Sequence, residues 1–242
     1  MESLPQELID KFIDNLPHPS LRSCSLVGRR WRRRSQERVF ASVGFSSERD
    51  LGRWYANIPQ DPSGIPSYVR SVRFQCIHSW RDPTIFGRVL KTFTSMTSLF
   101  MLKTAIPRPR NVPNSVPFGE FGQKIDWLML LSPQCTASTI MAFILSLPNL
   151  ERFYLIEPEP KKSPSTLQHA SQMRQLAELH LHAAGTGVGT ALAQCRLTSR
   201  KLSLVVSEAG LEQLLTLSSK VVVELGLSGV WSLMAVWKQK RC

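Results

Sequence analysis

The chain lacks paired cysteines, long apolar runs and an excess of acidic residues. Its five cysteines are far apart and form no C-x-x-C pair, which argues against a disulfide framework and a zinc site. Reduced thiols and the absence of an Asn-x-Ser/Thr site are typical of an intracellular protein. The acidic, polar start Met1–Asp10 does not resemble a signal peptide. Val221–Trp237 is short for a membrane span and contains Glu224. We therefore expect an intracellular protein, cytoplasmic, nuclear or both, without a membrane segment.

Motifs of catalysis and cofactor binding are also missing. We find no Ser-His-Asp elbow, cysteine-nucleophile motif or carboxylate pair. The stretch Ala183–Thr190 is rich in glycine, but Thr190 occupies the third glycine position of a dinucleotide-binding fingerprint, which favours a flexible turn. His180 and His182 form an H-x-H pair without further ligands at a metal-binding spacing. The sequence predicts a non-catalytic protein with no cofactor and no metal.

The composition is that of a folded, basic protein. Hydrophobic residues make up 43% of the 242 positions, enough for a packed core. Lys and Arg outnumber Asp and Glu by 30 to 18, which gives a net charge of +12. Such an excess of positive charge is compatible with a nucleic acid or an acidic protein as a binding partner.

Residues 1–45 predict a compact module of three short helices. The first begins near Pro5, carries apolar residues at spacings of one, three and four, and ends at Pro17. Pro19 is suited to open a second helix, and Gly28 permits a break after it. A third helix is expected from Arg29 to about Ala41. Residues 46–67 contain several prolines and glycines and predict a connector, of which Trp54 and Tyr55 suggest that part packs down.

Residues 68–242 alternate short apolar strands with helix-like stretches. The expected strands are Ser71–Phe74, Ser98–Leu102, Asp126–Leu131, Glu151–Ile156, Ala177–His182, Lys201–Val206 and Val223–Leu227. The expected helices are Thr139–Leu147, Gly189–Cys195 and Gly210–Ser218. Two proline-rich loops, Pro107–Pro117 and Pro158–Pro164, read as surface insertions.

The strands recur at an interval close to that of leucine-rich repeats. The second apolar position of each L-x-L-like core is Met101, Leu130, Leu155, Leu181, Leu204 and Leu227, 23 to 29 residues apart. This predicts an irregular α/β solenoid with a parallel sheet on one face, following the small helical module in an α+β arrangement. We see no polar cap for the last repeat, so we expect a C-terminally truncated or differently spliced array.

The segment Leu4–Ser35 carries a specific resemblance. The string L-P-Q-E-L-I at Leu4–Ile9 and the later C-S-L-V and W-R segments, at Cys24–Val27 and Trp31–Arg32, are spaced as in the F-box-like domain of the large fungal F-box family. The match covers about a sixth of the chain. A degenerate leucine-rich tail is also the family's usual arrangement.

The resemblance implies a non-catalytic substrate adaptor of an SCF-type ubiquitin ligase. The F-box would dock on the Skp adaptor of the cullin-based complex, and the repeats would recruit a protein substrate that the sequence does not identify. A three-helix module cannot bury all of its apolar surface alone, so docking of a helix in a groove is expected. The residues carried over as adaptor-binding are Leu4, Pro5, Leu8, Ile9, Leu21, Leu26, Val27 and Trp31. Ile13 and Leu16 are assigned to internal packing.

An alternative rests on the basic run Gly28–Arg38, which contains six arginines. A basic leucine-rich scaffold could bind nucleic acid or a nuclear import receptor through Arg29–Arg34. We favour the solvent-exposed face of the third helix for these residues, which makes nucleic acid the less favoured partner and leaves a nuclear signal open.

Overall fold

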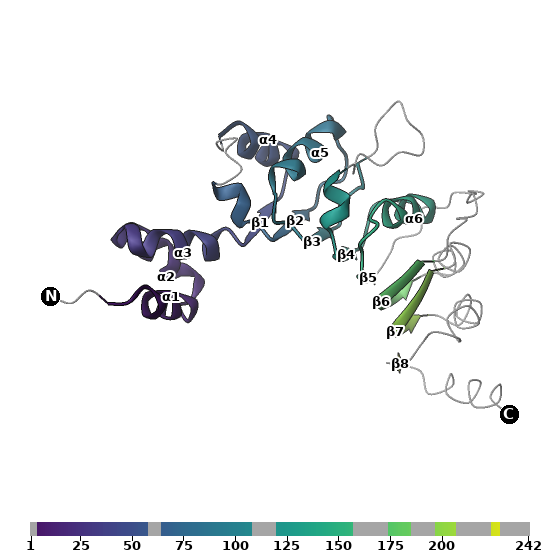
Figure 1. Ribbon diagram of the computed structural model, residues 1–242. Helices are drawn as coiled ribbons and strands as arrows, with labels where there is room; N and C mark the ends of the chain where they lie inside the picture. Colours follow the sequence, from purple (N-terminus) through teal and green to yellow (C-terminus); the bar gives the residue numbers. More distant parts are fainter. Residues whose placement is uncertain are drawn as a thin grey trace.

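The computed structural model describes residues 4–57, 64–107, 120–156, 174–184, 197–206 and 224–227 (Figure 1). Its helices are α1 (Gln6–Asp14), α2 (His18–Val27), α3 (Arg29–Val39), α4 (Glu48–Asn57), α5 (Pro83–Thr92) and α6 (Ala137–Leu145), with 3-10 turns η1 (Ile65–Tyr68) and η2 (Glu120–Lys124). Its strands are β1 (Ser42–Phe45), β2 (Ser71–Gln75), β3 (Ser98–Leu102), β4 (Trp127–Leu131), β5 (Arg152–Ile156), β6 (Arg174–Ala184), β7 (Leu197–Val206) and β8 (Glu224–Leu227).

The three predicted N-terminal helices are confirmed as α1, α2 and α3. The carbonyl of Pro5 accepts hydrogen bonds from the first turn of α1, and Pro19 lies in the first turn of α2, where its missing N–H costs nothing. Gly28 separates α2 from α3 with φ 176° and ψ 171°, an extended conformation that any residue adopts. The break therefore does not require glycine at this position.

The strands of the described residues form one parallel sheet in the order β1 to β8. Each of the seven predicted strands overlaps an observed one. The six positions selected from the sequence are register partners of one another, in the pairs Met101–Leu130, Leu130–Leu155, Leu155–Leu181, Leu181–Leu204 and Leu204–Leu227. The 23- to 29-residue spacing therefore corresponds to one strand per step along the sheet.

The structure differs from the predicted connector at residues 46–67. This range contains α4, whose Leu51 is fully buried in the core of the sheet, and most of η1. The strand β1 lies just before it and pairs in parallel with β2. The parallel sheet thus begins at Ser42, and α4 is its first helix rather than a loop.

One face of the sheet packs against the helices. Along β1 to β5 buried and less buried residues alternate, as expected for a period of two. The buried residues form a core with side chains of α4, α5 and α6, which lie on the same side of the strands (Figure 1). The strand residues of this core include Val72, Phe74, Leu99, Met101, Leu128, Leu130, Phe153 and Leu155.

Backbone geometry repeats at both ends of the central strands. At the start, one carbonyl accepts two N–H groups from the next strand, and this role falls to Ala41, Arg70, Thr97, Asp126 and Glu151. At the other end, Cys76, Lys103 and Ser132 follow β2, β3 and β4 with φ of 57°, 46° and 47°. Each of these three donates its N–H to the last residue of the neighbouring strand. The same local conformation therefore recurs in step with the sequence period.

Several predicted segments lie outside the described residues. These are the helices Gly189–Cys195 and Gly210–Ser218, nearly all of both proline-rich loops, most of the glycine-rich turn, and the C-terminal segment beyond Leu227.

Candidate functional site

The N-terminal module has its own small core. Ile9, Ile13 and Leu21 are at most 4% exposed and form a cluster separate from the core of the sheet. Leu16, Trp31 and Val39 are partly buried against this cluster. The assignment of Ile13 and Leu16 to internal packing fits this geometry.

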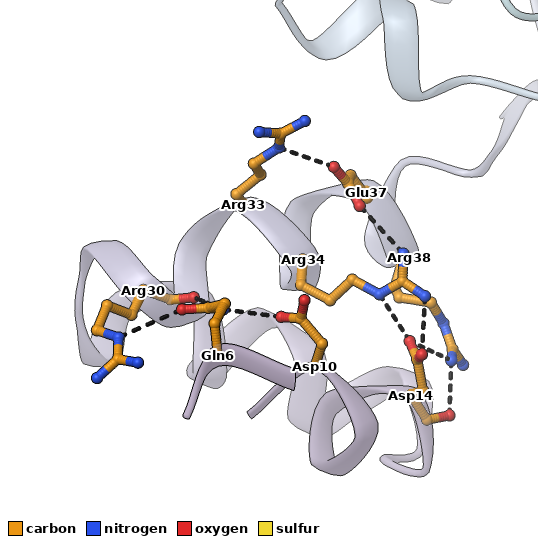
Figure 2. Close-up of polar contacts among 8 residues, drawn as sticks. All are labelled: Gln6, Asp10, Asp14, Arg30, Arg33, Arg34, Glu37 and Arg38. Carbon is orange, nitrogen blue, oxygen red and sulfur yellow. Dashed lines mark hydrogen bonds and ion pairs between the residues drawn. The ribbon is translucent and has the colours of Figure 1, made fainter. Parts of the chain in front are cut away.

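Polar contacts also connect α1 with α3 (Figure 2). The Arg34 guanidinium donates to both carboxylate oxygens of Asp14, at 2.8 and 2.7 Å. Arg38 donates to the backbone carbonyl of Asp14 at 2.6 Å and lies 3.4 Å from its carboxylate. The hydrogen bond from Arg34 is the main reason why the pKa of Asp14 lies below its ordinary value, and Arg38 adds to the effect.

A second contact lies near the start of both helices, one turn before Arg34 on α3 and about two turns before Asp14 on α1. Arg30 donates to the side-chain oxygen of Gln6 and to the backbone carbonyl of Leu4. Gln6 in turn donates to Asp10 at 2.8 Å and to the carbonyl of Arg30 at 3.0 Å. Since Arg30, Arg34 and Arg38 are spaced by four, one face of α3 is directed at α1.

The arginine-rich run is therefore largely engaged within the module. Besides these three residues, Arg33 pairs with Glu37 at 3.0 Å, and Arg32 donates to the carbonyl of Ser25 at 3.4 Å. Arg33 remains 82% exposed, so its ion pair contributes little. This arrangement explains the arginines by helix packing and does not favour a phosphate-binding patch at Arg29–Arg34.

The apolar surface of the module is unusual. Among the described residues six large hydrophobic side chains are exposed, and five of them belong to α1, α2 or the residues just before α1. Leu4, Leu8 and Phe12 are 59%, 51% and 55% exposed. Leu8 and Phe12, four residues apart, share one face of α1, and Leu4 lies just before the helix; we call the three residues the stripe on α1. Leu26 and Val27, at the end of α2, are 81% and 69% exposed. Folding alone does not account for these positions.

The predicted adaptor-binding residues divide into two groups. Leu4, Pro5, Leu8, Leu26 and Val27 are exposed, and Trp31 is partly buried. Ile9 and Leu21, which were also predicted to bind the adaptor, lie in the module core with 4% and 1% exposure.

Phe12 is exposed beside these residues but was not among the adaptor-binding residues predicted from the sequence. Its ring meets that of Trp31 edge to face, with centroids 5.6 Å apart. The spacing Leu4–Leu8–Phe12 is a signal that separates the stripe from Ile9 and Ile13 on the neighbouring face.

The two strand histidines do not form a metal site with their neighbours. His180 lies in a stack with Tyr154, and its Nε2 is 3.5 Å from Glu178, while His182 is exposed two residues further along β6. Within the part of the chain that the structure describes, we find no cluster of three or more potential metal ligands. No helix in that same part is both long and apolar enough to cross a membrane.

Residues 1–40 match the family model of the F-box domain. With its three helices and exposed apolar stripe, the N-terminal module is an F-box domain, the class of domain that binds the Skp adaptor within cullin-based ubiquitin ligases. F-box proteins are in general non-catalytic adaptors of these complexes. No curated protein matches the chain.

Proposed function

We propose that this chain is a substrate-recognition adaptor of an SCF-type ubiquitin ligase. The observation that carries the proposal is the exposed stripe Leu4, Leu8 and Phe12 on a domain that matches the F-box. An exposed stripe of this kind on one helix is expected to lie in an apolar groove of a partner. The Skp adaptor is the partner that the domain class supplies.

The proposed adaptor interface is revised by the burial of the module. It comprises Leu4, Pro5, Leu8, Phe12, Leu26 and Val27. The ring of Trp31 packs edge to face against the ring of Phe12. Ile9 and Leu21 act through the module core, where they hold α1 against α2.

The parallel sheet is the proposed substrate-recruiting region, as a degenerate leucine-rich-repeat-like solenoid. Three observations support this proposal: the strands lie in the sheet in their sequence order, one carbonyl at the start of each central strand accepts two hydrogen bonds, and a residue with positive φ follows each of β2, β3 and β4. We propose residue 41, between the end of α3 and the start of β1, as the boundary between the two parts, in place of the predicted boundary after residue 45. As a receptor of a ubiquitin ligase, the protein would work in the cytoplasm or the nucleus and leave ubiquitin transfer to other subunits.

Replacement of Leu8 and Phe12 by aspartate tests this function. Both side chains are more than half exposed, so the double variant L8D/F12D keeps the module core and should fold. Two charged residues in the centre of an apolar interface should weaken binding to a purified Skp adaptor by at least about 100-fold. Isothermal titration calorimetry on the full chain measures the loss.

The matched control is Leu145→Asp on α6, since Leu145 is also an exposed apolar residue, at 40%, but lies outside the module. We expect the Leu145→Asp variant to bind the Skp adaptor as tightly as the unmodified chain does. Both variants should have the circular dichroism spectrum of the unmodified chain. Unchanged affinity of L8D/F12D would refute the interface, and the absence of binding by the unmodified chain would refute the function.

A further inference from the structure

The face of the sheet that points away from α4, α5 and α6 has an ordered surface. The register aligns its side chains in rows across the strands. The middle row runs through Arg73, Phe100, Met129, Tyr154 and His180, one residue from each strand from β2 to β6. All except the exposed Arg73 are half-buried, because neighbouring side chains of the row cover one another. We call this surface, together with Arg152 and Lys201, the open sheet face.

The aromatic residues of the open sheet face lie against their neighbours. The rings of Tyr154 and His180 stack with centroids 4.2 Å apart and an angle of 6° between their planes. Trp127 contacts Tyr154 at 5.6 Å, and the Arg73 guanidinium lies 4.9 Å from the centroid of Phe100. The row is therefore a continuous, rigid apolar strip that begins at a guanidinium.

The charges on the open sheet face favour an anionic partner. Arg73, Arg152 and Lys201 are positive, and among the described side chains of these strands Glu178 is the acidic one, the register partner of both Arg152 and Lys201. Glu178 already accepts a hydrogen bond from Tyr154 at 2.9 Å and lies 3.5 Å from His180. Arg152 has only a loose pair, at 3.8 Å, with Asp126. The three cations therefore stand against two carboxylates, Glu178 and Asp126, in a chain with a net charge of +12.

We propose that the open sheet face binds an extended acidic segment of a protein, with apolar side chains on Phe100, Met129 and Tyr154 and carboxylates at Arg73, Arg152 and Lys201. This inference rests on the proposed function, since it names the class of substrate that the adaptor recruits.

The strand spacing sets the spacing of the carboxylates. Adjacent strands are about 4.8 Å apart, so Arg73 and Arg152 stand roughly 15 Å apart across the sheet, and Arg152 and Lys201 roughly 10 Å. At about 3.4 Å per residue, an extended segment would carry acidic residues about four to five and then about three positions apart.

A polypeptide fits this face better than a single-stranded nucleic acid. Nucleic-acid bases bind by stacking on free aromatic faces. Here Tyr154 and His180 use a face on each other, and a guanidinium covers Phe100.

The proposal is tested with three fluorescein-labelled probes and the full chain. The probes are a random copolymer of glutamate and tyrosine, polyglutamate, and a 20-nucleotide oligo(dT). Fluorescence anisotropy at roughly physiological salt gives the affinities, since low salt would exaggerate surface charge. We expect the copolymer to bind at least about tenfold more tightly than polyglutamate, because only the copolymer can use the apolar strip.

Two triple variants with equal charge change separate this face from the overall charge. Reversal of Arg73, Arg152 and Lys201 to glutamate should weaken copolymer binding at least about tenfold. Reversal of Arg49, Arg53 and Lys91, which are exposed on α4 and α5, should leave it within about twofold. Thermal unfolding verifies that both variants fold. If the variant with Arg73, Arg152 and Lys201 reversed to glutamate does not fold, replacement of the same three residues by glutamine serves as the milder variant.

Three results would overturn the inference: no copolymer binding, equal losses in the two triple variants, or binding of oligo(dT) that depends on Arg73, Arg152 and Lys201 while copolymer binding does not. Skp adaptor binding of the same proteins is measured in parallel. Because the open sheet face and the stripe on α1 share no residue, failure of copolymer binding with intact adaptor binding rejects this inference alone. If the unmodified chain does not bind the Skp adaptor, the proposed function is rejected.

Discussion

Asp14 shows how single residues fix the F-box. Its carboxylate accepts from Arg34 through both oxygens and its backbone carbonyl accepts from Arg38, so one residue of α1 fixes two turns of α3. The charged form is favoured in the folded module, and the pKa of Asp14 is lowered. A carboxylate with a lowered pKa stabilises the fold above its unfolded pKa, about 3.9, and this contribution disappears as the pH falls through the folded value.

We therefore expect the contribution of Asp14 to the thermal midpoint of the module to be constant between pH 5 and 7 and to decline below about pH 4. The Asp14→Asn variant should unfold at a lower temperature at pH 7 and approach the unmodified chain near pH 3. Circular dichroism melts across this pH range measure the difference. Glu7→Gln, at an exposed carboxylate of the same helix, is the control. A constant gap between Asp14→Asn and the unmodified chain down to pH 3 would show that the ion pair does not contribute.

At this scale the sequence was informative about residue type and poor about direction. Leu8 and Ile9 are adjacent, both apolar and both part of the L-P-Q-E-L-I string, yet Leu8 is 51% exposed and Ile9 is 4% exposed. A core position and an interface position require the same chemistry, so only the placement of α2 and α3 distinguishes them. The arginines behave alike: their number suggested a basic patch, but their spacing of four directs three of them at α1.

At the scale of elements, strands were predicted well and the first helix of the sheet was missed. Period-two patterning with one buried face determines register, and this is why Met101 and Leu130 could be aligned from the sequence. The strand β1 was missed because Gly44 interrupts a four-residue pattern. The helix α4 was missed because Gly52 and the prolines that follow it are typical of loops.

Gly52 offers a test of why α4 forms. A Cβ atom built there would lie 3.5 Å from Cδ1 of Ile85, an ordinary van der Waals distance, so alanine fits between α4 and α5. Because glycine is a poor helix former, Gly52→Ala should raise the free energy of unfolding by up to about 1 kcal/mol in a urea titration. Gly52→Leu should lower it, since a longer side chain must displace Ile85. Stabilisation by leucine would show that α4 and α5 are not in close contact.

At the scale of the whole molecule, the residues that the structure describes form two cores of very different size. Ile9, Ile13 and Leu21 form the core of the F-box, whereas the core of the sheet runs from Val43 to Leu202. The fold class at this scale could be predicted, because strand and helix patterns alternate along the chain. The independence of the two cores could not, since separation depends on which apolar faces meet. A small core is marginal on its own, so the F-box is the part that gains most from a partner.

Hydrogen exchange on the full chain can detect this difference. We expect amides of α1 to α3 to exchange faster than those of β2 to β5, because local opening of a three-residue core costs less than opening of the sheet. A Skp adaptor present at about 100 times its dissociation constant should raise the protection of the F-box by about 2.7 kcal/mol, roughly a hundredfold slower exchange. Protection of β2 to β5 should stay unchanged, since the adaptor binds only the folded F-box. The L8D/F12D variant should show no gain. Equal gains in both parts would mean that the F-box and the sheet open together, and adaptor binding would then be coupled to the stability of the sheet.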